Sequence, residues 1–193
     1  MPRRGWVCMI FIAASCKAAS EPARAAGGRR ETIAIGPDNA RIAFVGSKVT
    51  GSNRGQFDRF SGTIELIDGS PGASRVSVDL DMTSVSTDAA ELTKHLKTAD
   101  FFDVAQYPSA HFRSTKILTG EGEGHYEVAG NLELHGVTRW MRFPATIEVD
   151  STSITVASEF SMNRHDFGVD HPGTADDPIR DLVLIQLSVH AKR

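Results

Sequence analysis

The stretch Val76-Ser77-Val78-Asp79-Leu80-Asp81-Met82 alternates strictly between apolar and polar side chains. Successive side chains of a β-strand point to opposite faces, so this period of two predicts a strand with one buried face and one solvated face. The stretch therefore favours a protein built from antiparallel strands over an apolar core.

The same alternation recurs along most of the chain. It is found at residues 33–35, 42–44, 64–66, 111–118, 126–134, 141–149, 154–162 and 183–189. Clusters of turn-forming residues separate the runs at residues 36–39, 68–72, 120–124 and 150–151. This spacing predicts an all-β fold, either an antiparallel sandwich or a barrel. A closed barrel of about eight strands can enclose one small ligand and leaves no exposed edge.

One segment interrupts the strand pattern. Ala89, Leu92 and Leu96 recur at helical spacing, which predicts a short helical excursion around residues 88–102.

The N-terminus has the features of an export signal. Two arginines precede an uncharged, mostly apolar run at residues 6–14, which is shorter than the roughly 20 residues that span a bilayer as a helix. We therefore expect a signal peptide at residues 1–16, a flexible tether at residues 17–30 and one domain at residues 31–193.

Two cleavage sites fit this leader. Ala13-Ala14-Ser15-Cys16 resembles the lipobox of bacterial lipoproteins, in which case Cys16 is lipidated and anchors the protein to a membrane. The alternative is ordinary cleavage near Ala18 or Ala19, or within residues 23–26, which gives a soluble periplasmic protein. Both alternatives predict export to a bacterial envelope.

Composition argues against several classes of function. The formal net charge is −3 and no basic run follows the N-terminus, so nucleic-acid binding has no electrostatic support. Cys8 and Cys16 both lie in the predicted leader, so the domain has no disulfide, thiol nucleophile or thiolate metal site.

Candidate catalytic and metal-binding residues are weakly supported. His95, Lys97 and Asp100 could form an acid–base cluster, but the end of a helix is the favoured interpretation, because cations stabilise that position. One late loop contains histidines and acids whose spacing fits neither a zinc nor a calcium pattern: His165, Asp166, His171, Asp176 and Asp177. We therefore expect no catalytic residue, no metal and no cofactor.

The stretches HLKTADFFDVAQYPSAHFRST (95–115) and GNLELHGVTRWMRFPA (130–145) carry a family resemblance. With shorter matches at residues 55–57, 60–62, 84–87 and 163–169, they resemble the YceI-like family of bacterial polyisoprenoid-binding proteins, from about Glu31 to the C-terminus. The resemblance implies an eight-stranded antiparallel, lipocalin-like barrel with a helical excursion, usually exported. Its long apolar tunnel would hold an isoprenoid or another long-chain amphiphile. The sequence departs from the family pattern at residues 46–52 and 170–180.

The inward positions of the strands, with two phenylalanines from the excursion, are the predicted tunnel lining. They are Phe44, Ile64, Leu66, Val76, Val78, Leu80, Met82, Phe101, Phe102, Phe112, Leu132, Phe143, Ile147, Val156 and Phe160. A site for a long apolar ligand also needs a few polar groups at one end. The candidates for binding a phosphate or carboxylate head group are Lys48, Lys97, Arg113 and Arg164.

Three functions stay open at this point. The first is an exported carrier of an isoprenoid or fatty-acyl lipid, without enzymatic activity. The second is an envelope enzyme that acts on a lipid through His95, Asp100 or His165. The third is an envelope stress or structural protein whose barrel is packed solid. The sequence also leaves a homodimer open.

Overall fold

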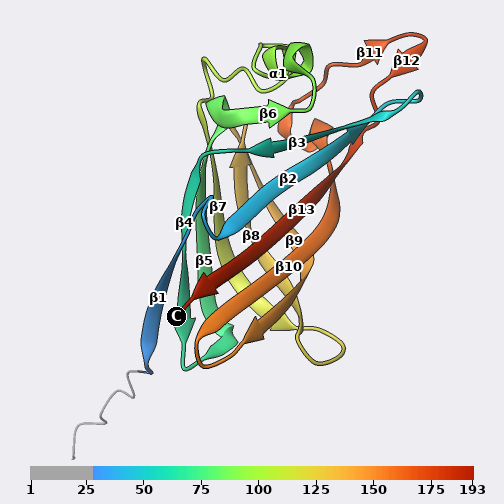
Figure 1. Ribbon diagram of the computed structural model, residues 1–193. Helices are drawn as coiled ribbons and strands as arrows, with labels where there is room; N and C mark the ends of the chain where they lie inside the picture. The colour runs from blue at the N-terminus through green and yellow to red at the C-terminus, as the bar shows by residue number, and fades with distance from the viewer. Residues whose placement is uncertain (1–27) are drawn as a thin grey trace, which may run out of the picture.

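The alternating runs form long antiparallel strands in the computed structural model, which describes residues 28–193 (Figure 1). The strands are β1 (Arg30–Ile35), β2 (Ala40–Ser47), β3 (Ser52–Phe57), β4 (Phe60–Ile67), β5 (Ser70–Asp81), β6 (Val85–Thr87), β7 (Ser109–Thr119), β8 (His125–Leu134), β9 (Val137–Val149), β10 (Ser153–Asn163), β11 (Gly173–Thr174), β12 (Asp177–Pro178) and β13 (Leu182–Lys192). The helix α1 (Ala90–Leu96) and two short 3₁₀ helices, η1 (Met82–Ser84) and η2 (Arg164–Phe167), complete the fold.

One curled 11-stranded sheet contains all strands except β11 and β12, which pair with each other. Its order is β1-β4-β5-β7-β8-β9-β10-β13-β2-β3-β6, and every neighbouring pair is antiparallel. The predicted all-β, lipocalin-like architecture is confirmed, with more strands than the eight expected. The additional β3 has the sequence Ser-Asn-Arg-Gly-Gln-Phe, which has no apolar alternation, and β6 is only three residues long.

The backbone ladder does not close into a continuous ring. Strands β1 and β6 stand at the two ends of the sheet, and β1 instead lies beside the end of β13 (Figure 1). Here Arg193 donates through Nη2 to Glu31 Oε2 at 2.8 Å. The seam between β1 and β13 is therefore held by side chains. In a closed barrel, backbone hydrogen bonds would join the two strands instead.

The helical excursion is shorter than predicted. Only Ala90–Leu96 is helical, and residues 97–107 continue as turns fixed by backbone hydrogen bonds such as Phe102 N to Leu96 O at 3.1 Å. The excursion covers the end of the barrel away from β1 (Figure 1). Leu96 and Phe101 of the excursion form a core cluster with Val85 of β6 and Val169.

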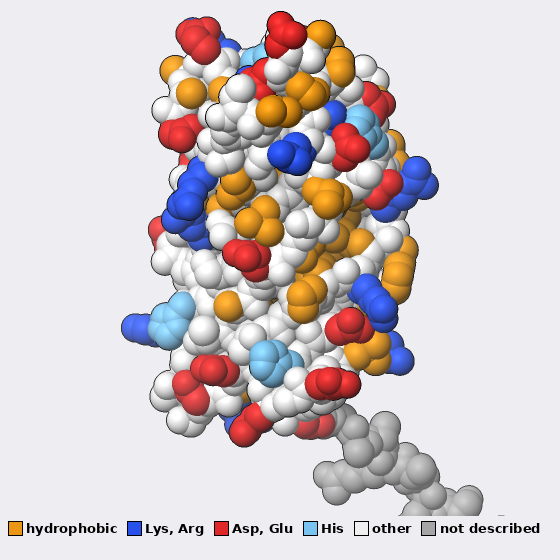
Figure 2. All heavy atoms as spheres, turned by 90° about the vertical axis from the view of Figure 1, so that its right-hand side faces the viewer, with side chains coloured by type: hydrophobic (Ala, Val, Ile, Leu, Met, Phe, Trp, Pro, Cys, Tyr) orange, Lys and Arg blue, Asp and Glu red, His pale blue; other side chains and the backbone are white. Residues whose placement is uncertain are grey.

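The side of the molecule seen in Figure 2 carries charges of both signs, with hydrophobic side chains exposed between them. Trp140 on β9 is 61% exposed. Among residues 28–193, no helix is both long and apolar enough to cross a membrane. The predicted signal peptide, Cys16 and the predicted tether up to residue 27 lie outside the described residues, and Arg30 at the end of that tether already belongs to β1.

Candidate functional site: two apolar cavities inside the barrel

Two cavities occupy the interior of the barrel. The larger one lies under the helical excursion and has a volume of about 230 Å³, measured as the space open to the centres of water molecules. The smaller one lies toward the β1 end and measures about 110 Å³ on the same scale. An apolar cavity of roughly 150 Å³ stays dry and binds benzene, so the larger cavity has room for part of an apolar chain.

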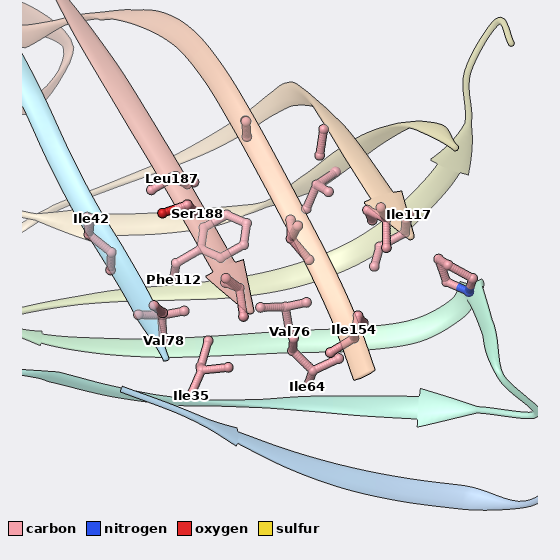
Figure 3. A pocket seen from close by; sticks show the side chains of 18 of the residues that line it. Ile35, Ile42, Ile64, Val76, Val78, Phe112, Ile117, Ile154, Leu187 and Ser188 are labelled. Carbon is pink, nitrogen blue, oxygen red and sulfur yellow. The ribbon is translucent and has the colours of Figure 1, made fainter. Parts of the chain in front are cut away.

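The fifteen predicted lining residues all border these cavities. Ile64, Leu66, Val76, Ile147 and Val156 border the smaller cavity, and Figure 3 shows Ile64 and Val76 pointing into it. The larger cavity is bordered by Phe44, Leu80, Met82, Phe101, Phe102, Leu132 and Phe160, and both cavities by Val78, Phe112 and Phe143. That these residues contact a ligand stays a prediction.

Other lining residues were not among those predicted. The β13 residues Val183, Ile185 and Leu187 border the larger cavity, and their alternation was a signal that could have identified them. Val169 and Ile179 also border it, but they come from irregular segments in which no period marks the inward side.

Aromatic rings lie where the two cavities adjoin. Phe112 and Phe143 border both, with ring centroids 5.6 Å apart, and Phe160 stacks on Phe143 at 4.5 Å and 12°. The ring of Phe112 lies over Gly130, where a Cβ atom would come within 2.7 Å of Phe112 Cζ. We call Phe112, Phe143 and Phe160 the aromatic waist.

Phe101 and Phe102 both face the larger cavity from the excursion. Phe101 is only 7% exposed, and the Phe102 ring lies 6.3 Å from that of Phe57, which in turn lies 5.7 Å from Phe44. The stretch 95–108 therefore contributes part of the cavity wall itself, in addition to covering the barrel end.

A family model described as the YceI-like domain matches residues 34–191. The chain belongs to the YceI-like family. A UPF0312 protein of Pseudomonas putida strain W619 is 35% identical over 131 residues, which cover 65% of this chain and 68% of that protein. A UPF0312 protein of Vibrio parahaemolyticus is 39% identical over 97 residues, covering 50% of this chain and 49% of that protein.

Solved structures share the fold of this YceI-like chain. Burkholderia cenocepacia BcnA superposes with a TM-score of 0.70 at 22% identity, covering 79% of this chain and 96% of BcnA. A polyisoprenoid binding domain from Saccharophagus degradans, implicated in plant cell wall breakdown, gives 0.65 at 19% identity, covering 83% of this chain and 97% of that domain. The predicted lipocalin-like fold is thus found in both.

Only Arg164 of the four predicted head-group cations borders a cavity. It is 7% exposed and donates to Val169 O through Nη1 at 2.6 Å and to Arg180 O through Nε at 3.2 Å. Its Nη2 makes longer contacts, 3.4 Å to Ile179 O and 3.9 Å to Asp181 Oδ1. Arg164 therefore borders the larger cavity with the carbon atoms of its side chain, and its guanidinium lies behind the apolar wall, bonded to backbone carbonyls.

The other three cations do not border the cavities of the YceI-like barrel. Lys48 Nζ pairs with Asp177 Oδ2 at 3.1 Å, and Lys97 caps the end of α1. Arg113 lies on the outer face, 2.5 Å from Asp79, because strand alternation turns Phe112 inward and Arg113 outward. The geometry thus contradicts a head-group role for Arg113. Arg41, which sequence reasoning missed, borders the smaller cavity.

The candidate catalytic residues also lie outside the cavities. Within residues 28–193, no histidine, acid or lysine borders either cavity, and this includes His95, Asp100 and His165. His165 bonds Asp170 through Nδ1 at 2.5 Å and Asp181 through Nε2 at 3.0 Å, and these two carboxylates, Asp170 first, raise its pKa above the usual value. His165 acts here as a tie between loops of the YceI-like fold.

Proposed function

We propose that this YceI-like protein binds an isoprenoid or another long-chain amphiphile, with the apolar chain inside the barrel. The observation that carries this proposal is the pair of apolar cavities that meet at Phe112 and Phe143. The polyisoprenoid binding domain of Saccharophagus degradans, which has the same fold, supports this choice of ligand class.

The energetics favour a cavity that is filled by a ligand. Each CH₂ of a bound chain that is buried in the apolar interior contributes about 0.8 kcal/mol, so tight binding needs no special chemistry.

The head group is proposed to lie at the Arg164 end. A chain that fills the larger cavity and passes the aromatic waist reaches the smaller one, so its polar end is left near the excursion. Nη2 of Arg164 has the longest of that residue's contacts and can exchange them for a phosphate or carboxylate oxygen. Calorimetric titration with geranylgeranyl phosphate and geranylgeraniol tests this orientation. Arg41→Gln should leave the preference for the phosphate unchanged, whereas loss of that preference would place the head group at the smaller cavity.

The proposed role is binding or carrying, without catalysis, because the cavity walls offer no acid–base group. The solid-barrel alternative is not favoured, because the larger cavity exceeds the size that accommodates benzene. Extraction of the protein from its native host, followed by mass spectrometry, should recover about one lipid per chain. Recovery of no lipid, together with no uptake of palmitate or geranylgeranyl phosphate, would count decisively against the proposal.

A pair of neighbouring residues on β8 provides a matched test. Leu132→Gln introduces an unpartnered amide into the wall of the larger cavity, whereas Glu133→Gln changes the adjacent, outward side chain. Since burying such an amide costs about 1–3 kcal/mol, Leu132→Gln should weaken palmitate binding roughly tenfold or more, and Glu133→Gln should not. Equal binding by both variants would show that palmitate binds elsewhere.

The location proposed for this binding activity is the bacterial envelope, reached through the leader at residues 1–16. Cys16 then either carries a lipid anchor or is removed with the leader. Substitution Cys16→Ser should move the protein from the membrane fraction to the soluble fraction. Unchanged fractionation would favour the soluble periplasmic alternative.

A further inference from the structure

Three metal-ligating side chains meet on the outer side of the excursion. His95 comes from the last turn of α1, Asp100 from the turn after it, and His171 from the loop that precedes β11. One ligand atom from each residue lies within 4.8 Å of the other two. Among residues 28–193, this is the one group of three or more such residues that could hold a metal ion.

Their surroundings hold the side chains in place. His95 Nε2 lies 2.8 Å from Asp100 Oδ2, and the rings of His95 and His171 are 5.0 Å apart at 78°. The Phe101 ring lies 4.9 Å from each imidazole. Since Phe101 also borders the larger cavity, the cluster lies directly behind a part of the cavity wall.

The residues before and after His171 are both held by hydrogen bonds. Its neighbour Asp170 accepts a hydrogen bond from His165 at 2.5 Å, and the carbonyl of Pro172 accepts one from Ile179 N at 2.9 Å. A ligand held by supporting contacts loses less freedom when it binds a metal. Both histidines are half-buried, whereas Asp100 is exposed.

We propose that His95, Asp100 and His171 form a binding site for a divalent transition metal, with zinc as the best-fitting ion. Two imidazoles and one carboxylate are typical zinc ligands, whereas calcium and magnesium prefer oxygen ligands throughout. In a tetrahedral zinc site, bonds of about 2.0–2.1 Å place the ligand atoms about 3.4 Å from one another. The three ligand atoms here lie within 4.8 Å of one another, so small side-chain rotations would bring them to that spacing. A water molecule or a fourth ligand completes the coordination.

The site joins segments that are far apart in the sequence. A bound ion connects α1 and its following turn to the loop at residues 168–181, and both contribute to the wall of the larger cavity through Phe101, Val169 and Ile179. Zinc therefore fastens the covered end of the barrel. This binding does not depend on which ligand, if any, fills the cavities.

The His165 cluster, by contrast, is arranged as a tie. His165 presents Nδ1 to Asp170 and Nε2 to Asp181, on opposite sides of its ring, so the three groups share no common point. His111 on β7 also pairs with a carboxylate, Asp79, at 2.6 Å, but no second histidine lies within reach. His111 is thus a matched control for His95, because both are partly exposed histidines paired with one aspartate.

The test measures zinc on the full, untagged chain after Cys8 and Cys16 have been alkylated. Equilibrium dialysis followed by elemental analysis should give about one zinc per chain, and zinc should raise Tm. His95→Ala and His171→Ala should abolish the stoichiometric binding, and Asp100→Asn should weaken it by about tenfold or more, since even outer-shell changes cost 10–100-fold. His111→Ala should leave it unchanged, and circular dichroism should show that every variant is folded.

Cobalt substitution reports the geometry independently of affinity. Tetrahedral Co²⁺ absorbs strongly in the visible region, and that band should appear in the wild-type chain and in His111→Ala but not in His95→Ala. The proposal is overturned if the wild-type chain binds no zinc, or if His95→Ala and His171→Ala bind as much zinc as the wild type.

Discussion

Gly130 shows how one residue sets the shape of the cavities. It lies on β8 under the ring of Phe112, and a Cβ atom there would approach Arg113 O to 2.5 Å and Phe112 Cζ to 2.7 Å. A residue with a side chain would therefore press on the backbone of β7 and displace a ring of the aromatic waist.

Gly130→Ala should destabilise the fold by about 1–3 kcal/mol, which is the usual cost of forcing extra atoms into a packed interior. Urea denaturation measures the change. Gly72→Ala is the control, because the nearest atom to its Cβ would be Ile117 O at 3.7 Å, an ordinary contact, and its effect should stay within about 0.5 kcal/mol. Equal effects of the two substitutions would contradict the close packing at Gly130.

His165 makes the stability of the late loop dependent on pH. The carboxylates of Asp170 and Asp181 raise its folded-state pKa above the ordinary 6.5, so the folded chain holds the proton more tightly than the unfolded chain. The resulting stabilisation is fully present below the unfolded pKa and is lost as the pH rises through the raised folded value.

The free energy of unfolding, measured in urea between about pH 6 and pH 9, should therefore show a decrease that His165→Asn removes. His190→Asn is the control, since His190 contacts only the hydroxyl of Thr155 at 3.2 Å among side chains. If the free energy of unfolding of His165→Asn falls with pH as much as that of the wild type, the decrease must come from another titratable group.

At the scale of elements, α1 covers the larger cavity with a helix of only about two turns. Leu96 is its buried anchor, 7% exposed, and borders the cavity, whereas Lys94 points to solvent and pairs with Glu91 at 2.7 Å. The stability of this cover depends on Leu96 more than on the helix itself, because seven residues are too few for an independently stable helix.

Leu96→Ala should cost about 2–5 kcal/mol in the local stability of the excursion. Hydrogen exchange should accelerate across residues 90–107 while the amides of β8 stay protected, and bound palmitate should dissociate faster. Lys94→Ala should change neither quantity. Loss of protection throughout the barrel in Leu96→Ala would mean that the cover and the sheet unfold together.

Element faces could be predicted from the sequence wherever the period of two held. On β5, the alternation of Val76, Val78 and Leu80 with polar residues predicts which side chains point inward. On β7, the same alternation places Phe112 inside and Arg113 outside. The head-group prediction for Arg113 was therefore wrong for a reason that was already visible in its own strand.

The remaining features depend on contacts that no local pattern encodes. His171 meets His95 only because the loop before β11 folds over the excursion, and Val169 and Ile179 reach the cavity from the same irregular region. Strand β3 pairs with β2 and β6 despite its polar sequence, since its neighbours supply the hydrogen-bonding partners. Long-range packing, which local periodicity does not report, decides each of these cases.

At the scale of the whole molecule, the two cavities link the stability of the fold to the binding of a ligand. A ligand that binds only the folded state contributes about 2.7 kcal/mol when its free concentration is 100 times Kd. In a domain of this size, about 1 kcal/mol corresponds to roughly 2–4 °C.

Saturation with palmitate or geranylgeranyl phosphate should therefore raise Tm by roughly 5–10 °C in scanning calorimetry. The increase should be smaller in Leu132→Gln at the same ligand concentration and unaltered in Glu133→Gln. An unchanged Tm in the presence of calorimetrically bound ligand would indicate binding to the surface rather than to the interior.

The exposed position of Trp140 determines whether tryptophan fluorescence can report a ligand inside the barrel. The chain has two tryptophans, Trp6 and Trp140, and Trp6 lies in the predicted leader. Trp140 on β9 is 61% exposed, so its emission reports the solvent and should not change when a ligand fills the interior. The double substitution Trp140→Phe and Phe160→Trp moves the single indole of residues 28–193 against Phe143. There, displacement of water or closure of a void around a bound chain should shift its emission to the blue.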